Sequence, residues 1–334
     1  MAKRIVRRAA RALLALTGCL VLLGITALVS LASQYSGRPS QAARSTGNDA
    51  EWLGHAWVDG RKGQSDVDVL AAQLRGTGIR DLFVHAGPFS DDGSLDPAIR
   101  QQAAWLTKAL HTALPGVRVQ AWLGAHPLPD ELHLHSEETR AAVLIAVGQI
   151  IDDGFDGIHY DFEPVDDGND ELITILRETR ALARQRHVML SVSAIHGEPW
   201  PGMAACVTLM PGRSALWSGG YLRRVALEVD QVAVMAYDTT LPTGAAYGGY
   251  VRRVTEIAIA VVPPEVTLFI GVPAYHDQHI RHGHGETVAA SLRGIRLAWG
   301  AKPPERKFGV AMYVDFAATA DDWASYHRDW MSPK

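Results

Sequence analysis

The sequence predicts a (β/α)8 TIM barrel over residues 50–334, preceded by an apolar N-terminal segment. Two observations point to this fold. First, eight short apolar runs alternate with eight helix-like segments, a number typical of such barrels at this chain length. Second, polar, histidine and aromatic residues recur where the apolar runs end, and barrel enzymes build their sites at that face. A doubly wound α/β sheet is the alternative arrangement of the same elements.

The expected elements follow one another in regular order. Strands are expected where β-branched, aromatic and other apolar residues gather in short runs, at 52–58, 79–85, 117–125, 155–163, 188–195, 230–237, 266–274 and 308–315. Helices are expected where apolar residues recur three or four positions apart, near 66–76, 96–113, 137–151, 170–185, 215–227, 249–261, 286–298 and 320–330.

Residues 1–32 are expected to be a targeting or anchoring segment outside the barrel. Residues 12–32 form an uncharged apolar run behind a strongly basic flank, which is the pattern of a signal peptide or signal anchor. Residues 33–49 are rich in Ser, Gln, Ala, Gly and Arg, so we expect a flexible linker there.

Three fates of this segment remain open. It is long enough to stay in the membrane as an anchor through residues 12–32. The small residues of Ser30-Leu-Ala32 also offer a cleavage site before Ser33. Finally, Leu16-Thr-Gly-Cys19 is similar to a bacterial lipoprotein box, with Cys19 as the lipidated residue. All three fates predict an extracytoplasmic barrel, membrane-anchored or secreted.

The charge distribution argues against nucleic acid as a partner. The first 48 residues hold seven of the 32 basic side chains and no acidic one, so 25 basic side chains face 36 acidic ones in the remainder. A part of the chain with a net charge of −11 is a poor match for a phosphate backbone.

The most informative stretch is Gly154 to Val165, which reads GFDGIHYDFEPV. A strand alternates its faces, so His159, Asp161 and Glu163 are expected on one side of it. Neighbouring carboxylates cannot easily both ionise, and one is therefore pushed toward its protonated form. A protonated carboxyl is the group that glycosidic bond cleavage needs, which makes Glu163 the candidate general acid.

Two motifs resemble glycoside hydrolase family 18, the chitinase-like barrels. The family carries D-G-x-[DN]-x-[DN]-x-E on its fourth strand, and this chain has Asp156-Gly-Ile-His-Tyr-Asp-Phe-Glu163 there. The sixth strand of the family commonly ends in M-x-Y-D, and this chain has Met235-Ala-Tyr-Asp238. Both motifs fall on the expected strands.

The resemblance implies a retaining, substrate-assisted mechanism on N-acetylhexosamine-containing polysaccharide or oligosaccharide, without a cofactor or metal. Glu163 would be the acid and base, and Asp161 would orient the 2-acetamido group. Tyr237 would hydrogen-bond the acetamido carbonyl, while Met235 and Asp238 would line the subsite. Chitin-like and peptidoglycan-like glycans both carry the required acetamido group.

Three positions depart from the family pattern. His159 stands where the family has Asp or Asn. A neutral imidazole there could hydrogen-bond Asp161 and a protonated one would hold Asp161 ionised, so we expect the pH profile of the acid to shift. The third strand reads Trp122-Leu-Gly-Ala-His126 in place of S-x-G-G, and Tyr313 stands where chitinases usually place a tryptophan. Further substrate-binding candidates at the strand ends are Trp57, His85, His126, His196, Tyr275 and Asp315.

Two other classes of function stay open. Histidines on successive strands, together with Asp315, also suit a metal-dependent barrel hydrolase. A non-catalytic glycan-binding barrel is the other alternative, although such barrels generally lack the acid that Glu163 supplies here.

Overall fold

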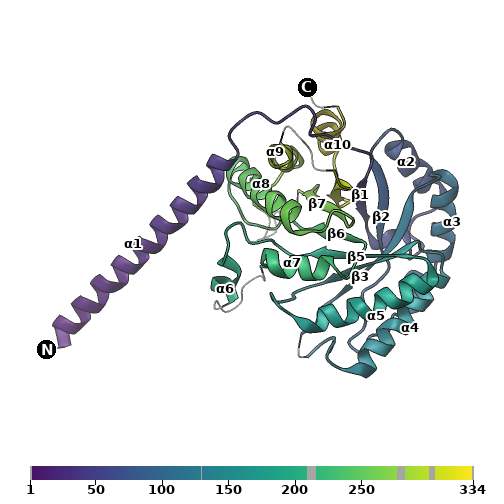
Figure 1. The fold of residues 1–334 in the computed structure, drawn as a ribbon, viewed down its shortest axis with the longest axis horizontal. Helices are drawn as coiled ribbons and strands as arrows, with labels where there is room; N and C mark the ends of the chain where they lie inside the picture. The colour runs from purple at the N-terminus through teal and green to yellow at the C-terminus, as the bar shows by residue number, and fades with distance from the viewer. Residues whose placement is uncertain (1, 129, 209–215, 277–282, 301–304, 333–334) are drawn as a thin grey trace.

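The computed structural model describes residues 2–128, 130–208, 216–276, 283–300 and 305–332. Eight parallel strands close into a barrel in the order β1 to β8, and helices surround it (Figure 1). The predicted TIM barrel is therefore confirmed, since a doubly wound sheet would be open.

The elements lie close to their expected positions. The strands are β1 (Asp49–Leu53), β2 (Ile79–His85), β3 (Arg118–Ala125), β4 (Gly157–Phe162), β5 (Met189–Ala194), β6 (Gln231–Val234), β7 (Thr267–Pro273) and β8 (Phe308–Tyr313). The barrel helices are α2 (Gln64–Leu74), α3 (Ala103–Ala113), α4 (Glu137–Asp152), α5 (Asp170–Arg186), α7 (Gly219–Ala226), α8 (Gly244–Val261), α9 (Val288–Trp299) and α10 (Ala320–Tyr326). Shorter pieces are the 3₁₀ helices η1 (His55–Trp57) and η2 (Pro97–Arg100), helix α6 (Met203–Thr208) and a π-helical turn, η3 (His327–Met331).

Some boundaries differ from the expected ones. The helix expected at 96–113 is divided into η2 and α3, and α6 was not expected. The start of the helix expected at 215–227 lies outside the described residues, and α7 begins at Gly219.

The expectation of a first strand at 52–58 is wrong. Strand β1 ends at Leu53, and η1 follows it. The chain leaves the sheet because the Gly54 N–H donates to Asp315 Oδ1 (2.8 Å) and not to a neighbouring strand. The apolar run misled the prediction because Trp57 and Val58 are buried although they are not in a strand.

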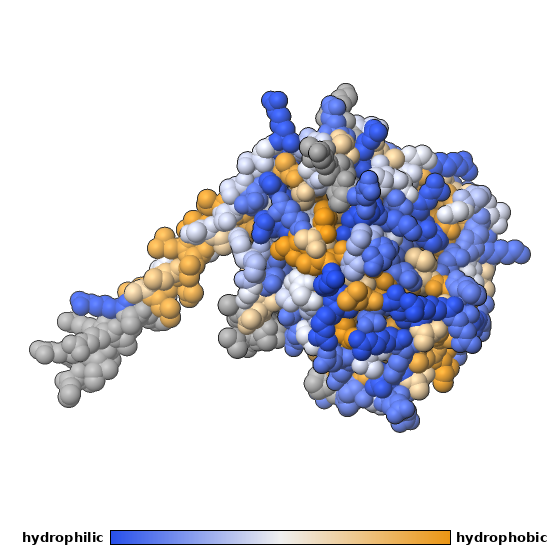
Figure 2. Space-filling view, viewed as in Figure 1, coloured by the Kyte–Doolittle hydropathy of each residue, from blue (hydrophilic) through white to orange (hydrophobic). Residues whose placement is uncertain are grey.

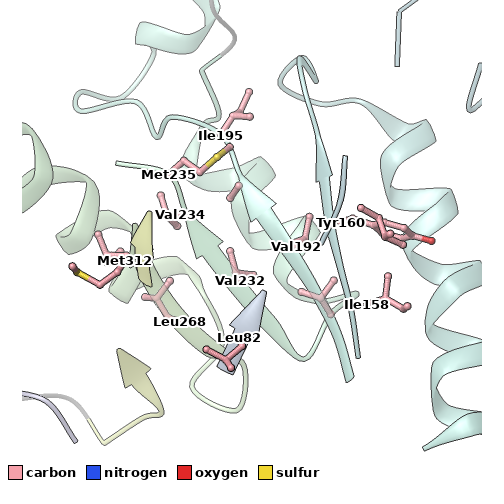
Figure 3. Packing of buried hydrophobic residues seen from close by; sticks show 14 of the residues in the cluster. Leu82, Ile158, Tyr160, Val192, Ile195, Val232, Val234, Met235, Leu268 and Met312 are labelled. Carbon is pink, nitrogen blue, oxygen red and sulfur yellow. The ribbon is translucent and has the colours of Figure 1, made fainter. Parts of the chain in front are cut away.

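Strand side chains alternate between the helices and the barrel interior. Figure 3 shows members of the outer set, among them Leu82, Ile158, Tyr160 and Val192, in the core between strands and helices. The inner set includes Trp52 and Phe83, which form a separate interior cluster. On β4, the alternation directs His159 and Asp161 inward, as the sequence predicted.

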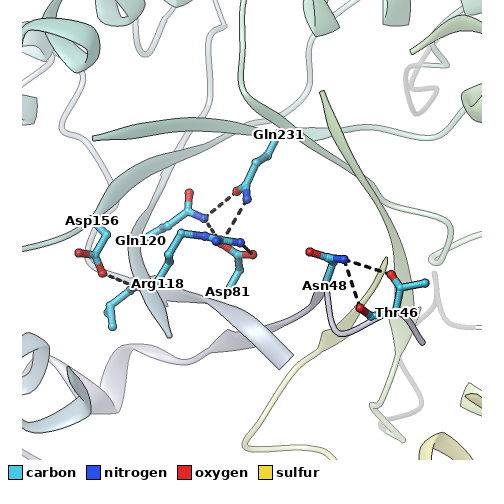
Figure 4. A network of polar contacts seen from close by, with 8 residues as sticks. Thr46, Asn48, Asp81, Arg118, Gln120, Asp156 and Gln231 are labelled. Atoms are coloured by element: carbon cyan, nitrogen blue, oxygen red, sulfur yellow. Dashed lines mark hydrogen bonds and ion pairs between the residues drawn. The ribbon is translucent and has the colours of Figure 1, made fainter. Parts of the chain in front are cut away.

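A polar network fills the lower interior, near the N-terminal ends of the strands. Arg118 on β3 donates to both carboxylate oxygens of Asp81 on β2 (2.7 and 2.5 Å). Gln120 and Gln231 donate to Asp81 Oδ1 from β3 and β6 (2.8 and 3.2 Å; Figure 4). These bonds satisfy a carboxylate that is wholly shielded from solvent.

The N-terminal segment forms one long helix, α1 (Ala2–Gln34), that projects from the side of the barrel (Figure 1). Its part from Leu14 to Gln34 has a mean hydropathy of 2.4 and is long and apolar enough to cross a membrane. A signal sequence has the same length and composition.

Candidate active site

A cavity of about 720 Å³ opens at the C-terminal ends of the strands. Nine of the predicted site residues line it: His85, His126, Asp161, Glu163, His196, Met235, Tyr237, Asp238 and Tyr313. They come from six of the eight strands or the loops that follow them. The fold therefore brings together most of the residues that the sequence singled out.

Two acids lie at the end of β4: Asp161 is in the strand, and Glu163 directly follows it. Trp122 Nε1–H donates to Asp161 Oδ2 (2.7 Å). Burial raises the pKa of Asp161, while hydrogen bonds from Trp122, Ser193 and Glu163 act against that rise. The Glu163 carboxyl is one of these donors, which is consistent with two neighbouring carboxyls of which one carries a proton.

His159 lies beneath the acids and not in the cavity wall. Its side chain is fully buried and stacks on Phe83, with ring centroids 3.8 Å apart. Trp52 Nε1–H donates to His159 Nε2 (3.3 Å), and Ser191 contacts Nδ1 (2.7 Å). Burial lowers the pKa of His159 to about 3, so the imidazole is neutral.

Ser193 connects His159 with the acids. Its hydroxyl contacts His159 Nε2 (3.0 Å) and also hydrogen-bonds Asp161. The neutral His159 therefore places no positive charge beside Asp161, and Ser193 is the residue that contacts both side chains.

The exit of β6 presents Met235, Tyr237 and Asp238 to the cavity. Tyr237 stacks on Tyr313 with a centroid distance of 5.0 Å and an interplanar angle of 12°. Burial raises the pKa of Tyr237 well above its usual value, and nearby Asp161 and Glu163 add to the rise. Its hydroxyl therefore stays protonated and can donate a hydrogen bond at any ordinary pH.

A buried glutamate holds this exit in place. Glu286, in the loop before α9, accepts from the Asp238 N–H (2.8 Å) and the Thr239 N–H (2.7 Å). Tyr275 lies behind the cavity wall, where its hydroxyl is 2.7 Å from both Asp238 Oδ1 and Glu286 Oε2. The backbone of Asp238 has a φ of 58°, a left-handed conformation that costs energy in a residue other than glycine.

The histidines of the rim differ in environment. Burial, and to a lesser degree nearby His55, lowers the pKa of His85 to about 4. The ring centroids of His85 and Trp122 are 4.6 Å apart. His196 Nε2 contacts the Tyr237 carbonyl. His126 is exposed and pairs with Glu131 (3.0 Å).

Four predicted residues lie outside the cavity lining: Trp57, His159, Tyr275 and Asp315. Trp57 is on η1, where its Nε1–H donates to Asp315 Oδ2 (2.7 Å). Asp315 also accepts from Gly54, so these two residues fasten the β1 exit to the β8 exit. Their contacts are structural.

Sequence reasoning missed three residues of the site: Trp122, Ser193 and Glu286. Trp122 was noted as a departure from a motif but not as a donor to Asp161. The period-two alternation of β3 and β5 places Trp122 and Ser193 on the inner face, and that signal could have found them. No local pattern points to Glu286, because the Asp238 and Thr239 N–H groups that it holds are 48 and 47 positions away in the chain.

The described residues contain no group of three or more His, Cys, Asp or Glu side chains arranged to hold a metal ion. The histidines that suggested a metal site are spread over separate surroundings: His55 contacts the His85 carbonyl, His126 pairs with Glu131, and His159 is buried among serines and aromatic rings. Their partners give the metal hypothesis no support.

No family model matches the sequence, and no curated protein matches it. Solved structures do match the barrel. The spore cortex-lytic enzyme SleL of Bacillus megaterium QM B1551 has 12% identity and a TM-score of 0.59, over 88% of this chain and 75% of that chain. A chitinase from Chromobacterium violaceum ATCC 12472 has 14% identity and a TM-score of 0.58, over 86% and 99%.

A Group IV chitinase of Ostrinia furnacalis also matches, with 20% identity and a TM-score of 0.50 over 68% of this chain and 66% of that chain. At these identities the likeness concerns the fold. The chain is a (β/α)8 barrel that is similar in fold to the barrels of chitinases and of SleL.

Proposed function

We propose that the protein is an exported glycoside hydrolase that cleaves glycans containing N-acetylhexosamine, of the chitin or peptidoglycan type. The observation that carries the proposal is that Asp161, Glu163 and Tyr237 line one cavity, where burial raises the pKa of both Asp161 and Tyr237. One proton, one carboxylate and one fixed hydroxyl donor are the groups that a substrate-assisted glycosidase needs.

In the proposed reaction, Glu163 gives its proton to the glycosidic oxygen as the bond to the anomeric carbon breaks. The carbonyl oxygen of the 2-acetamido group attacks that carbon and forms an oxazolinium ion. Asp161 accepts a hydrogen bond from the acetamido N–H and offsets the positive charge of the oxazolinium ion. The Tyr237 hydroxyl donates a hydrogen bond to the acetamido carbonyl oxygen. Glu163 then takes a proton from water, and the water oxygen bonds to the anomeric carbon as the bond from that carbon to the acetamido oxygen breaks. The 2-acetamido group is restored and the sugar is released with retained configuration.

The cavity wall suits a sugar ring. Tyr313 and Trp122 supply aromatic surface for stacking. His85 adds an uncharged imidazole, because its pKa is about 4. Met235 and Asp238 complete the lining at the β6 exit. We infer that these residues bind the sugar on which the acids act, with His126 and His196 nearer the rim.

Export is supported by α1, the apolar helix that precedes the barrel. Chitin-like and peptidoglycan-like polymers lie outside the cytoplasm, and the solved barrels with similar folds include a spore cortex-lytic enzyme. Both considerations favour a glycan of the cell envelope or its surroundings.

The test compares wild type with Glu163→Gln on fluorogenic N-acetylhexosaminides, chitin oligomers and peptidoglycan glycan strands. Glu163→Gln removes the transferable proton but keeps the shape of the side chain, so we expect hydrolysis to fall by about 10² to 10⁴-fold while glycan binding persists. Glu131→Gln is the matched control, since Glu131 also lines the cavity but pairs with His126.

Product analysis by NMR should show the β-anomer first from a β-linked substrate, as retention requires. Equal hydrolysis by wild type and Glu163→Gln would remove Glu163 from the mechanism. Binding without hydrolysis by wild type, on every glycan tested, would favour a glycan-binding barrel. Stoichiometric zinc in purified active protein would favour the metal-dependent hydrolase.

A further inference from the structure

The last turns of α1 are part of the barrel wall. Leu31 is only 4% exposed and belongs to the same apolar core as the barrel helices, and Leu28 packs against that core. In Figure 1 this end of α1 meets α8, whereas the rest of α1 projects away from the barrel. The helix therefore has a docked end and a free end.

Two glycines of α8 make this close contact possible. A Cβ added to Gly249 would lie 1.8 Å from the Leu31 carbonyl oxygen, and one added to Gly248 would lie 2.2 Å from the Tyr35 ring. Glycine is unfavourable inside a helix, yet α8 has two in succession. The Leu31 contact is with backbone, so no side-chain rotation could relieve the clash at Gly249.

Arginines of α8 and α9 bind the chain that follows α1. Arg252 donates to the Gln34 carbonyl (2.8 Å), and Arg293 donates to the Gly37 carbonyl (2.8 Å) and lies over the Tyr35 ring. Arg296 Nε donates to the Ala43 carbonyl (3.0 Å), and Ala43 is fully buried. The stretch that the sequence marked as a linker thus follows the surface of the barrel.

The free part of α1 is apolar and uncovered. Leu14, Leu20, Leu22 and Val29 are each more than half exposed, and Figure 2 shows the apolar surface of α1 standing out from a largely hydrophilic body. In water such a surface is costly. A lipid bilayer is the partner whose chemistry fits it, because the helix satisfies its own backbone hydrogen bonds.

We propose that the N-terminal segment is retained as a membrane anchor and that its docked end fixes the barrel at the bilayer surface. Cleavage before Ser33 would remove Leu31 and so uncover the surface of α8 at Gly249. Within the docked helix, Ser30 to Ala32 are also held against α8, where a protease cannot take them in extended form. This proposal does not depend on the catalytic one.

The first experiment determines the N-terminus of the full chain after expression in cells with an intact export pathway. We expect a protein that keeps residues before Ser33, sediments with membranes and resists extraction by carbonate. We also expect Cys19→Ala to behave like wild type. A mature N-terminus at Ser33 in the soluble fraction, or at a lipid-modified Cys19, would overturn the proposal.

The second experiment tests the docking with Gly249→Ala in the full chain, reconstituted in liposomes. Trypsin can cleave after the exposed Arg44, whereas Arg38 precedes a proline. If α1 is docked, Gly249→Ala pushes it away and frees the following segment, so cleavage after Arg44 should be about tenfold faster or more.

The matched control is Gly148→Ala in α4, where an added Cβ meets nothing within 4 Å. This control makes the same change inside a helix and should leave the Arg44 cleavage rate unchanged. Tyr35→Ala gives a second route to undocking without touching α8, and should also speed cleavage. Equal rates for Gly249→Ala, Gly148→Ala and wild type would refute the docking, whatever the glycan assays show.

Discussion

Two inward-facing aspartates of the same barrel, Asp81 and Asp161, have opposite surroundings. Asp81, at the lower end, is held by the two-pronged Arg118 contact and by two glutamines. Asp161, near the upper end, accepts from Trp122, and no Arg or Lys forms an ion pair with it among the described residues. Burial therefore raises the pKa of Asp161.

The difference separates a structural acid from a reactive one. The Asp81 carboxylate is fully occupied by one cation and two amide donors, so it is held in place as part of the structure. A carboxyl without a cation exchanges its proton readily with a neighbour, which is what acid–base chemistry requires. Of these two aspartates, the one without a cation lies at the end where TIM barrels place their active sites.

The largest predicted effect is on kcat, which should fall when Asp161 is replaced but not when Asp81 is replaced. Asp161→Asn should lower kcat by about 10²-fold or more, because an amide cannot balance the positive charge that forms in the reaction. Asp81→Asn should leave kcat per folded molecule within about twofold. Steady-state kinetics on the best glycan, with folded protein measured by circular dichroism, checks both. Similar losses of kcat for the two variants would contradict the assignment of Asp161 as reactive and Asp81 as structural.

The next predicted effect is on the free energy of unfolding, which should fall when Asp81 is replaced but not when Asp161 is replaced. Asp81→Asn removes the charge that Arg118 faces, so the free energy of unfolding should fall by about 2–3 kcal/mol, the partial exposure of Arg118 keeping the loss below that of a fully buried pair. Asp161→Asn should be neutral or stabilising, since it removes a desolvated carboxyl. Urea unfolding at pH 7 measures both, and a loss of stability for Asp161→Asn would contradict the assignment.

Glu51 on β1 is a third buried acid, and its effect on stability should depend on pH. Burial raises its pKa well above the usual value, and Oε2 lacks a hydrogen-bond partner. A raised folded-state pKa means that its contribution to stability is present below about pH 4.5 and is lost as the pH rises. Glu51→Gln should therefore stabilise the protein by about 1–2 kcal/mol at pH 7.

The Glu51→Gln gain should disappear at pH 4, where wild-type Glu51 is protonated in both the folded and the unfolded state. Thermal unfolding of both proteins at the two pH values is the measurement. A gain of the same size at pH 4 and pH 7 would show that ionisation of Glu51 is not its cause.

The smallest predicted effect concerns the donor to Asp161. Trp122→Phe keeps an aromatic ring beside the sugar but removes the N–H, so kcat should fall about tenfold with little change in KM. The activity optimum should also move upward, since a lost donor raises the pKa of Asp161 further. A rise in KM with kcat unchanged would indicate that Trp122 acts only as a stacking surface.

Much of the fold could be predicted because barrel strands are buried on both faces and read as short apolar runs. Seven strands fall close to their expected places, and the motif Asp156 to Glu163 lies on β4 as expected. The first strand was misplaced because the run from Trp52 to Val58 is apolar throughout. What ends β1 is a contact with Asp315, more than 250 residues away, which no local pattern reveals.

The site was only partly predictable for the same reason. Alternation along β4 gives the direction of His159 but not its depth, and depth decides that it is a neutral, buried residue. Strand ends pointed to Tyr237 and Asp238, whereas Glu286 acts on them through contacts that only the folded chain creates. The roles of the acids remain predictions until the kinetic tests are made.

The hydrogen bonds of Glu286 to the Asp238 and Thr239 N–H groups limit which loops of this barrel can be exchanged separately. One carboxylate ties the loop after β6 to the loop after β7, and it does so through backbone N–H groups, which every sequence possesses apart from proline. The two loops are therefore one module for exchange between related barrels. A graft that carries the Asp238 loop without its glutamate should lose the geometry it was meant to transfer.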